Sequence, residues 1–150
     1  MKRIYLLRVA LVCLLPVLSA AAQEKGYWRA ASTTAKGVTG DIAFAGTKIT
    51  LNFSSFTVAQ IRTLEPAEAQ ALFNADPGGN GNLYRLSIPG DKRFLHHNTL
   101  CGTEDTQYAI TYVAGHDLQV AFFSGSSIPT LTPEAITGSD RLCGIYSYVR

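Results

Sequence analysis

The sequence predicts an all-β protein, mainly antiparallel, folded as a small β-barrel or β-sandwich of about seven or eight strands with one short helix near residues 66–73. Three observations predict this class. Apolar and polar residues alternate with a period of two over much of the chain, which is typical of strands with one buried face. Turn-forming clusters rich in Gly, Pro, Asn and Asp separate these stretches at short intervals. Only one segment has a composition typical of a helix.

The first expected strands form a hairpin. In residues 48–53 the apolar residues Ile49, Leu51 and Phe53 alternate with polar ones, which indicates a strand with these side chains on a buried face. Residues 40–46 alternate in the same way. We therefore expect the two segments to pair across a short turn.

A third strand and the expected helix follow the hairpin. Residues 55–64 alternate less regularly and also predict a strand. After Glu65 the chain contains a run of good helix formers, with Pro66 at a position suited to a first helical turn. We expect a short helix at residues 66–73.

The second half of the chain predicts further strands, at residues 83–88, 107–113, 118–124 and 142–150. Tyr84, Leu86 and Ile88 are expected on one face of the first of these. The next two form the clearest hairpin, and both are apolar enough that we expect one of them to be covered on two faces. Residues 125–140 contain prolines and glycines with little periodicity, which predicts a loop.

Residues 1–22 have the pattern of a secretory signal peptide. Lys2 and Arg3 precede an apolar stretch that continues to about Leu18, and small side chains lead to Ala22. We expect cleavage after Ala22 and a periplasmic or secreted mature protein.

Cleavage at this position leaves residues 23–150 as a single β-rich domain. The clean apolar run of the leader, residues 9–18, is shorter than the roughly 20 residues that span a bilayer, so no transmembrane span is expected in the mature chain. An outer-membrane barrel is the alternative. Its strands need about 9–11 residues, and most of the expected strands are shorter.

Removal of the leader also changes the net charge. The whole chain has 13 basic and 11 acidic residues, and three of the basic residues, Lys2, Arg3 and Arg8, lie in the leader. Ten basic and 11 acidic residues remain, so the mature chain has a net charge of −1. Because proteins that bind nucleic acids carry an excess of positive charge, we expect no nucleic-acid partner.

Two cysteines remain after cleavage, Cys101 and Cys143, and each lies in the tripeptide Leu-Cys-Gly. In an oxidising compartment such a pair indicates a disulfide, and closing a loop of this length contributes about 4 kcal/mol to stability. The alternative is a reactive thiol at Cys101 with His96 or His97 as its base. A thiolate nucleophile needs a reduced and accessible sulfur, so we favour the disulfide.

Lys92, Arg93, His96 and His97 are the residues most suggestive of a binding site. The two cations can receive a carboxylate or a phosphate, and paired histidines can hold a metal ion. Adjacent residues of a strand point to opposite faces, however, and no metal-binding histidine spacing occurs. We assign neither a metal nor a cofactor, and a polar connection beside the disulfide is the alternative interpretation of this segment.

A hydrolase is a second functional interpretation. It would use His96, His97 or His116 with Asp105 or Asp117 for acid–base chemistry. No G-x-S-x-G motif supports a serine nucleophile. We therefore assign no catalytic residue.

In general architecture the expected domain is similar to small periplasmic inhibitor and ligand-binding barrels, a likeness that does not fix function. The leading expectation is a non-enzymatic binding module of the bacterial envelope, which holds a small ligand or docks a partner protein as an inhibitor does. A periplasmic hydrolase and a passive structural component of the envelope remain as alternatives.

Overall fold

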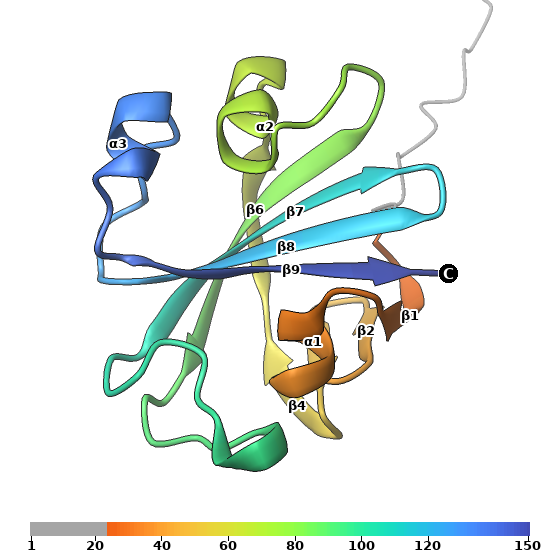
Figure 1. Ribbon diagram of the computed structural model, residues 1–150, viewed down its shortest axis with the longest axis vertical. Helices are drawn as coiled ribbons and strands as arrows, with labels where there is room; N and C mark the ends of the chain where they lie inside the picture. The colour runs from red at the N-terminus through yellow and green to blue at the C-terminus, as the bar shows by residue number, and fades with distance from the viewer. Residues whose placement is uncertain (1–23) are drawn as a thin grey trace, which may run out of the picture.

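The computed structural model describes residues 24–150, so the expected signal peptide at residues 1–22 lies outside the described residues (Figure 1). The described chain is mostly antiparallel β, which confirms the expected fold class. Its strands are β1 Gly26–Ala30, β2 Ile42–Ala45, β3 Lys48–Leu51, β4 Ser54–Thr57, β5 Ala59–Thr63, β6 Asn80–Ile88, β7 Thr106–Ala114, β8 Asp117–Ser124 and β9 Leu142–Val149. The helical segments are α1 Thr33–Gly37, α2 Pro66–Phe73, η1 Leu95–His97 and α3 Pro133–Thr137.

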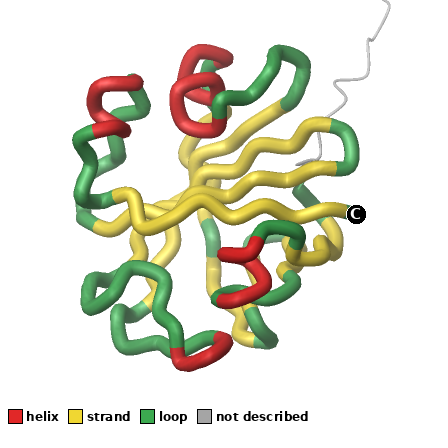
Figure 2. Tube along the Cα trace, viewed as in Figure 1, coloured by secondary structure: helices red, strands yellow, loops and turns green. Residues whose placement is uncertain are grey.

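The nine strands form one sheet in the order β4-β3-β2-β1-β9-β8-β7-β6-β5, and this sheet curls into a nearly closed barrel (Figure 2). The two end strands of this order, β4 and β5, are consecutive in the chain and are separated by Val58 alone. A single bent segment therefore pairs with β3 through its first half and with β6 through its second half. The sheet thus has nine strands where the sequence predicts about seven or eight. The difference arises because this segment is divided into two strands and because the sequence does not predict β1.

Strand β1 connects the two halves of the barrel. Its first residues pair with β2, with Trp28 opposite Ile42, and its last residues pair with β9, with Arg29 opposite Val149. Trp28 is completely buried between these halves. Its indole N–H donates a hydrogen bond of 2.7 Å to the carbonyl oxygen of Glu24.

Side chains fill the interior of the barrel. The expected inward face of β6 is confirmed, because Tyr84, Leu86 and Ile88 all belong to the interior core. Tyr146 and Tyr148 of β9 lie in the same core, and burial raises the pKa of both phenols. Such groups stay neutral at physiological pH, so the centre of the barrel is an uncharged, packed core.

A second core covers the outer face of β6, β7 and β8. It contains Leu72 and Phe73 of α2 together with Leu83, Ile110 and Phe123 of the sheet. Strands β7 and β8 are therefore both buried on two faces, whereas the sequence predicts this for one of them.

The segment at residues 125–140 is only partly the expected loop, because it contains α3. Thr132 precedes this helix and accepts a hydrogen bond of 3.3 Å from the Ala135 backbone N–H through its side chain. Pro133 then occupies the first helical position. A Thr N-cap followed by Pro is a helix-start signal, and it is sufficient here although the helix is too short to show periodicity.

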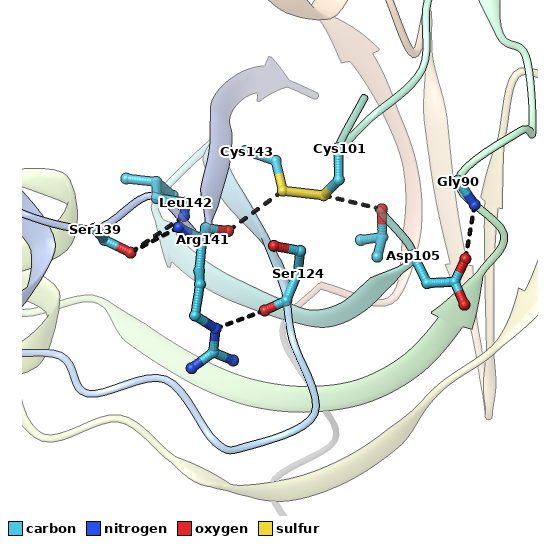
Figure 3. Close-up of a disulfide and its surroundings, with 9 residues drawn as sticks. Gly90, Cys101, Asp105, Ser124, Ser139, Arg141, Leu142 and Cys143 are labelled. Carbon is cyan, nitrogen blue, oxygen red and sulfur yellow. Dashed lines mark hydrogen bonds between the residues drawn. A yellow bond between two sulfur atoms is a disulfide. The ribbon is translucent and has the colours of Figure 1, made fainter. Parts of the chain in front are cut away.

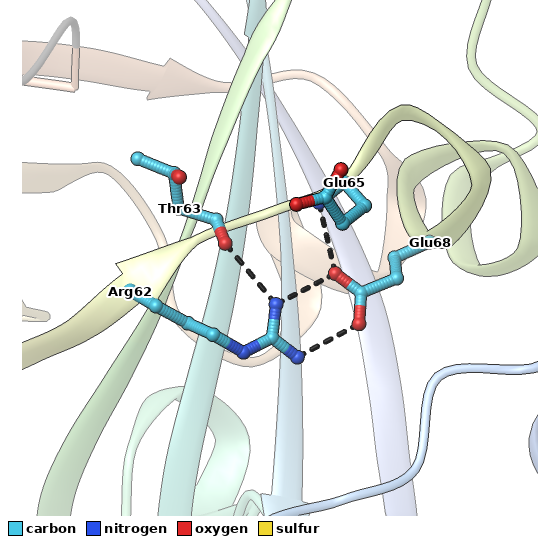
Figure 4. A network of polar contacts seen from close by, with 4 residues as sticks. All are labelled: Arg62, Thr63, Glu65 and Glu68. Atoms are coloured by element: carbon cyan, nitrogen blue, oxygen red, sulfur yellow. Dashed lines mark hydrogen bonds and ion pairs between the residues drawn. The ribbon is translucent and has the colours of Figure 1, made fainter.

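Helix α2 begins and ends as the sequence predicts. Figure 4 shows its start, where the Glu68 carboxylate accepts a 2.9 Å hydrogen bond from the Glu65 backbone N–H and two of 2.7 Å from Arg62. The guanidinium of Arg62 holds the pKa of Glu68 below its ordinary value. The helix ends at Asn74, whose φ of 50° is left-handed. These contacts connect β5 firmly to α2.

Cys101 and Cys143 form a disulfide with a Cα–Cα distance of 5.0 Å (Figure 3). The bond joins the segment between β6 and β7 to the start of β9, as the sequence predicts. Thr106 donates a 3.2 Å hydrogen bond to the Cys101 sulfur, and Asp105 accepts one of 2.9 Å from the Gly90 backbone. The disulfide and these hydrogen bonds together hold the segment against the barrel.

No helix within residues 24–150 is long and apolar enough to cross a membrane.

Candidate functional site

The residues of the expected binding site lie in the connection between β6 and β7, residues 89–105, at the bottom of Figure 1. Phe94 anchors this connection. It is buried in the interior core, and its ring centre lies 6.2 Å from that of Phe56 on β4. The connection is also attached to the segment after α1, because the Leu95 N–H donates to the carbonyl oxygen of Val38 at 2.9 Å. The segment is therefore a packed part of the fold.

Lys92 and Arg93 present two cations at this end of the barrel. Lys92 is half-buried, with its ammonium 5.8 Å from the centre of the Phe94 ring, and Arg93 is exposed. Among residues 24–150 neither forms an ion pair. Asp91 is the adjacent acid, so with neutral histidines the segment from Asp91 to His97 carries a net charge of +1.

His96 and His97 are exposed, and both have a left-handed backbone, with φ of 55° and 61°. They lie in the 3-10 turn η1 and not in a strand, so the rule that adjacent side chains point to opposite faces does not apply to them. Residues other than glycine adopt this conformation at a cost of about 1–3 kcal/mol, and it concentrates at functional sites. No three His, Cys, Asp or Glu side chains within the described residues are grouped so as to hold a metal ion.

Phe53 is a further residue of this end, and the sequence prediction for it is wrong. Strand β3 ends at Leu51, and Asn52 and Phe53 form a two-residue turn to β4, with φ of 44° and 65°. The Phe53 side chain is 99% exposed rather than buried. Two consecutive positive φ values define a type I′ hairpin turn, in which Asn-Gly is the preferred sequence.

The Phe53 turn lies at the same end of the barrel as the basic connection. Leu51, just before the turn, pairs with Ile42 at the start of β2. Gly40 precedes that strand and packs against Leu95, since a Cβ at Gly40 would lie 3.1 Å from the Leu95 Cδ1 atom. We call Asn52, Phe53 and residues 92–97 together the loop end.

The acid–base residues of the hydrolase interpretation are dispersed. His116 lies in the β7–β8 turn, whereas His96 and His97 precede β7. Strand β7, nine residues and about 30 Å long, lies between the turn that holds His116 and the connection that holds His96 and His97. Within residues 24–150 no hydrogen bond joins a histidine ring to a carboxylate, and Asp105 is occupied by the Gly90 backbone. This geometry gives the hydrolase interpretation no support.

A hollow of about 740 Å³ lies between β5, the start of α2 and residues 75–82. Tyr112 forms part of its wall, and the Tyr112 hydroxyl already accepts from Gly79 N–H at 2.9 Å and donates to the Asp76 carbonyl at 2.7 Å. The wall of this hollow contains no buried side-chain polar atom that lacks a partner within the described residues.

Comparison of the chain with protein-family models, with curated proteins and with solved structures returned no match. The class that the fold and the site define is an all-β barrel with an apolar and basic loop end.

Proposed function

We propose that this protein is an exported, non-enzymatic binding module that docks a partner protein through its loop end. The partner surface that fits this end has an apolar pocket for Phe53 and acidic residues opposite Lys92 and Arg93. The observation that carries the proposal is the complete exposure of Phe53 on a turn that disfavours it.

The placement of Phe53 works against stability, and this supports a role in binding. Its left-handed backbone costs about 1–2 kcal/mol, and the exposed ring gains no burial in return. A glycine would adopt the turn without that cost. Residues whose conformational preference conflicts with the backbone they occupy are concentrated at functional sites. Aromatic side chains also dominate the binding energy of protein interfaces.

The cations beside Phe53 define the chemistry of the partner. Lys92 and Arg93 have no internal ion pair among the described residues, so both are free to meet carboxylates. Charges at the rim of an interface mainly accelerate association and select the partner. Because two cations and one aromatic ring are a weak lipid anchor, a protein surface fits this end better than an anionic bilayer.

The rigidity of the loop end supports the same proposal. Phe94, the Leu95–Val38 hydrogen bond and the disulfide hold the basic connection from three sides. The Phe53 turn is part of the β3–β4 hairpin, which is paired throughout its length. A preorganised surface loses little conformational entropy when it binds, which favours affinity.

Site-specific photocrosslinking tests the proposal. With p-benzoylphenylalanine at position 53, we expect a discrete adduct with one protein in cells, and we expect the Lys92→Glu, Arg93→Glu variant to lose it. Ile128 is the matched control position, because it is also a large exposed side chain, at 51% exposure, and lies outside the loop end. The same adducts from both positions, no adduct from position 53, or an adduct with lipid alone would contradict the proposal.

A further inference from the structure

A buried carboxylate lies at the opposite end of the barrel. Glu24, just before β1, is 1% exposed. Its Oε1 atom accepts a hydrogen bond of 2.7 Å from the Asn82 side-chain amide and another from the Thr111 hydroxyl. Its Oε2 atom is buried and has no hydrogen-bond partner among residues 24–150.

Neighbouring side chains fix this carboxylate in place. Gln60 of β5 donates a 2.9 Å hydrogen bond to the Asn82 side-chain oxygen, which orients the Asn82 amide N–H toward Glu24. Thr111 is completely buried on β7 and contacts the same carboxylate oxygen. Side chains of β6 and β7 therefore contact one carboxylate oxygen, β5 supports this contact through Asn82, and the Oε2 oxygen has no hydrogen-bond partner among residues 24–150.

Neutral donors do not balance the charge of Glu24. Burial of a carboxylate without a counter-ion costs several kcal/mol, and buried charges in proteins are paired or bind cations. The single ion pair within the described residues joins Arg62 to Glu68, so the described chain provides no cation for Glu24. Lys25 is adjacent but exposed, and it forms no ion pair with this carboxylate.

A small cavity lies beside Glu24. Its volume is about 180 Å³, and its walls are Glu24, Lys25, Phe44, Gly46 and Tyr84. The exposed residues Lys25 and Gly46 mark its opening, and the rings of Phe44 and Tyr84, with centres 6.2 Å apart, form its apolar sides. Burial, together with the negative charge of Glu24, raises the pKa of Tyr84, so this phenol stays protonated.

The size and chemistry of the cavity restrict its occupant. At about 30 Å³ for each water in the liquid, 180 Å³ corresponds to roughly six waters, which is below the size of a typical drug-like pocket. A cavity lined by a carboxylate and by two aromatic rings suits an organic cation, which gains both an ion pair and a cation–π contact. A divalent metal fits less well, because no group of three His, Cys, Asp or Glu side chains exists among residues 24–150.

We propose that this cavity binds a primary ammonium group, with the Glu24 carboxylate as its counter-ion and the Phe44 and Tyr84 rings as its walls. The ammonium has two possible sources. One is a free short-chain amine that enters past Lys25. The other is the α-ammonium of the mature chain, which cleavage after Ala22 places one residue before Glu24. The proposal is independent of the loop end.

The test uses ethylammonium chloride as the probe and sodium chloride at equal ionic strength as the blank. Thermal unfolding is followed for a chain that starts at Gln23, with its free α-amino group verified by mass spectrometry, and for a chain extended by Gly-Ser-Gly. Each is compared with Glu24→Gln, which keeps the shape of the side chain and an oxygen for Asn82 and Thr111. Lys25→Met is the control for the adjacent cation.

If a free amine is the ligand, ethylammonium raises the melting temperature of both chains, and Glu24→Gln weakens its apparent affinity at least about tenfold. If the α-ammonium is the occupant, only the extended chain responds to ethylammonium, and the chain that starts at Gln23 is the more stable one until Glu24→Gln removes the difference. Lys25→Met keeps the response in both cases.

Equal responses of the wild type and Glu24→Gln, or loss of the response in Lys25→Met, would overturn the proposal. Should Glu24→Gln fail to fold, the Asn82 side-chain amide signals of the wild type give a second measurement by NMR. We expect ethylammonium to shift these signals in the extended chain. An unchanged Asn82 spectrum would also overturn the proposal.

Discussion

Replacement of Trp28 with alanine is expected to lower the free energy of unfolding by about 3–5 kcal/mol. Trp28 is fully buried at the point where β1 passes from β2 to β9, and the guanidinium of Arg150 lies 4.4 Å from the centre of its ring. Alanine leaves a cavity at the junction of the two halves of the barrel. Chemical unfolding followed by far-UV circular dichroism measures the effect, since Trp28 is the single tryptophan of the chain and the variant has no tryptophan fluorescence.

Trp28→Phe is the matched control. It keeps most of the apolar contact but removes the indole N–H that donates to the Glu24 carbonyl oxygen. We expect a smaller loss, of about 1–2 kcal/mol, because the main cost is one unpaired carbonyl and imperfect packing. A loss below about 1 kcal/mol for Trp28→Ala would contradict the central place of this side chain in the core.

Replacement of Cys101 and Cys143 with serine is expected to lower the free energy of unfolding by about 4 kcal/mol. The disulfide closes a loop with a sequence separation of 42, and the chain-entropy estimate for such a loop has this size. The native state also loses the bond between the 89–105 connection and β9. Guanidinium unfolding with and without a reductant measures the effect.

Reduced wild type is the internal control for the disulfide. We expect the reductant to lower the stability of the wild type to that of the double serine variant and to leave the variant unchanged. If the oxidised wild type and the variant unfold at the same denaturant concentration, the disulfide does not stabilise this fold.

The sequence predicts those elements whose signals are local. The period-two alternation of β6 and the helix formers of α2 identify both elements, and the pair of cysteines that follows an expected signal peptide indicates the disulfide. The sequence does not predict strand β1. Its five residues are too few to show a clear alternation, although Tyr27 is exposed and Trp28 is buried, and the strand pairs with two different partners.

The candidate site also contains residues that the sequence predicts and one, Phe53, that it does not. Lys92, Arg93, His96 and His97 are neighbours in the sequence, so their shared location is visible there. Phe53 continues the alternation of Ile49 and Leu51, and nothing local distinguishes it from a third buried residue. Its exposure follows from the pairing of Leu51 with Ser54, which leaves two residues for the turn.

The sequence does not predict the burial of Glu24, for a further reason. It follows the expected cleavage site, where a charged residue is an ordinary start of a mature chain. Its burial depends on Asn82 and Thr111, which lie 58 and 87 residues away in the sequence. Only the paired strands β6 and β7 bring these partners together.

The Phe53→Gly variant provides the most direct test of the loop end, when stability and partner binding are measured on the same preparation. Glycine adopts the positive φ of the turn without strain, so we expect the free energy of unfolding to rise by about 1 kcal/mol. Loss of an aromatic anchor costs at least about 2 kcal/mol of binding, so the dissociation constant for the protein captured at position 53 is expected to rise about 30-fold or more. A more stable protein that binds far more weakly is the predicted result. Unchanged affinity in the folded Phe53→Gly variant would contradict the account.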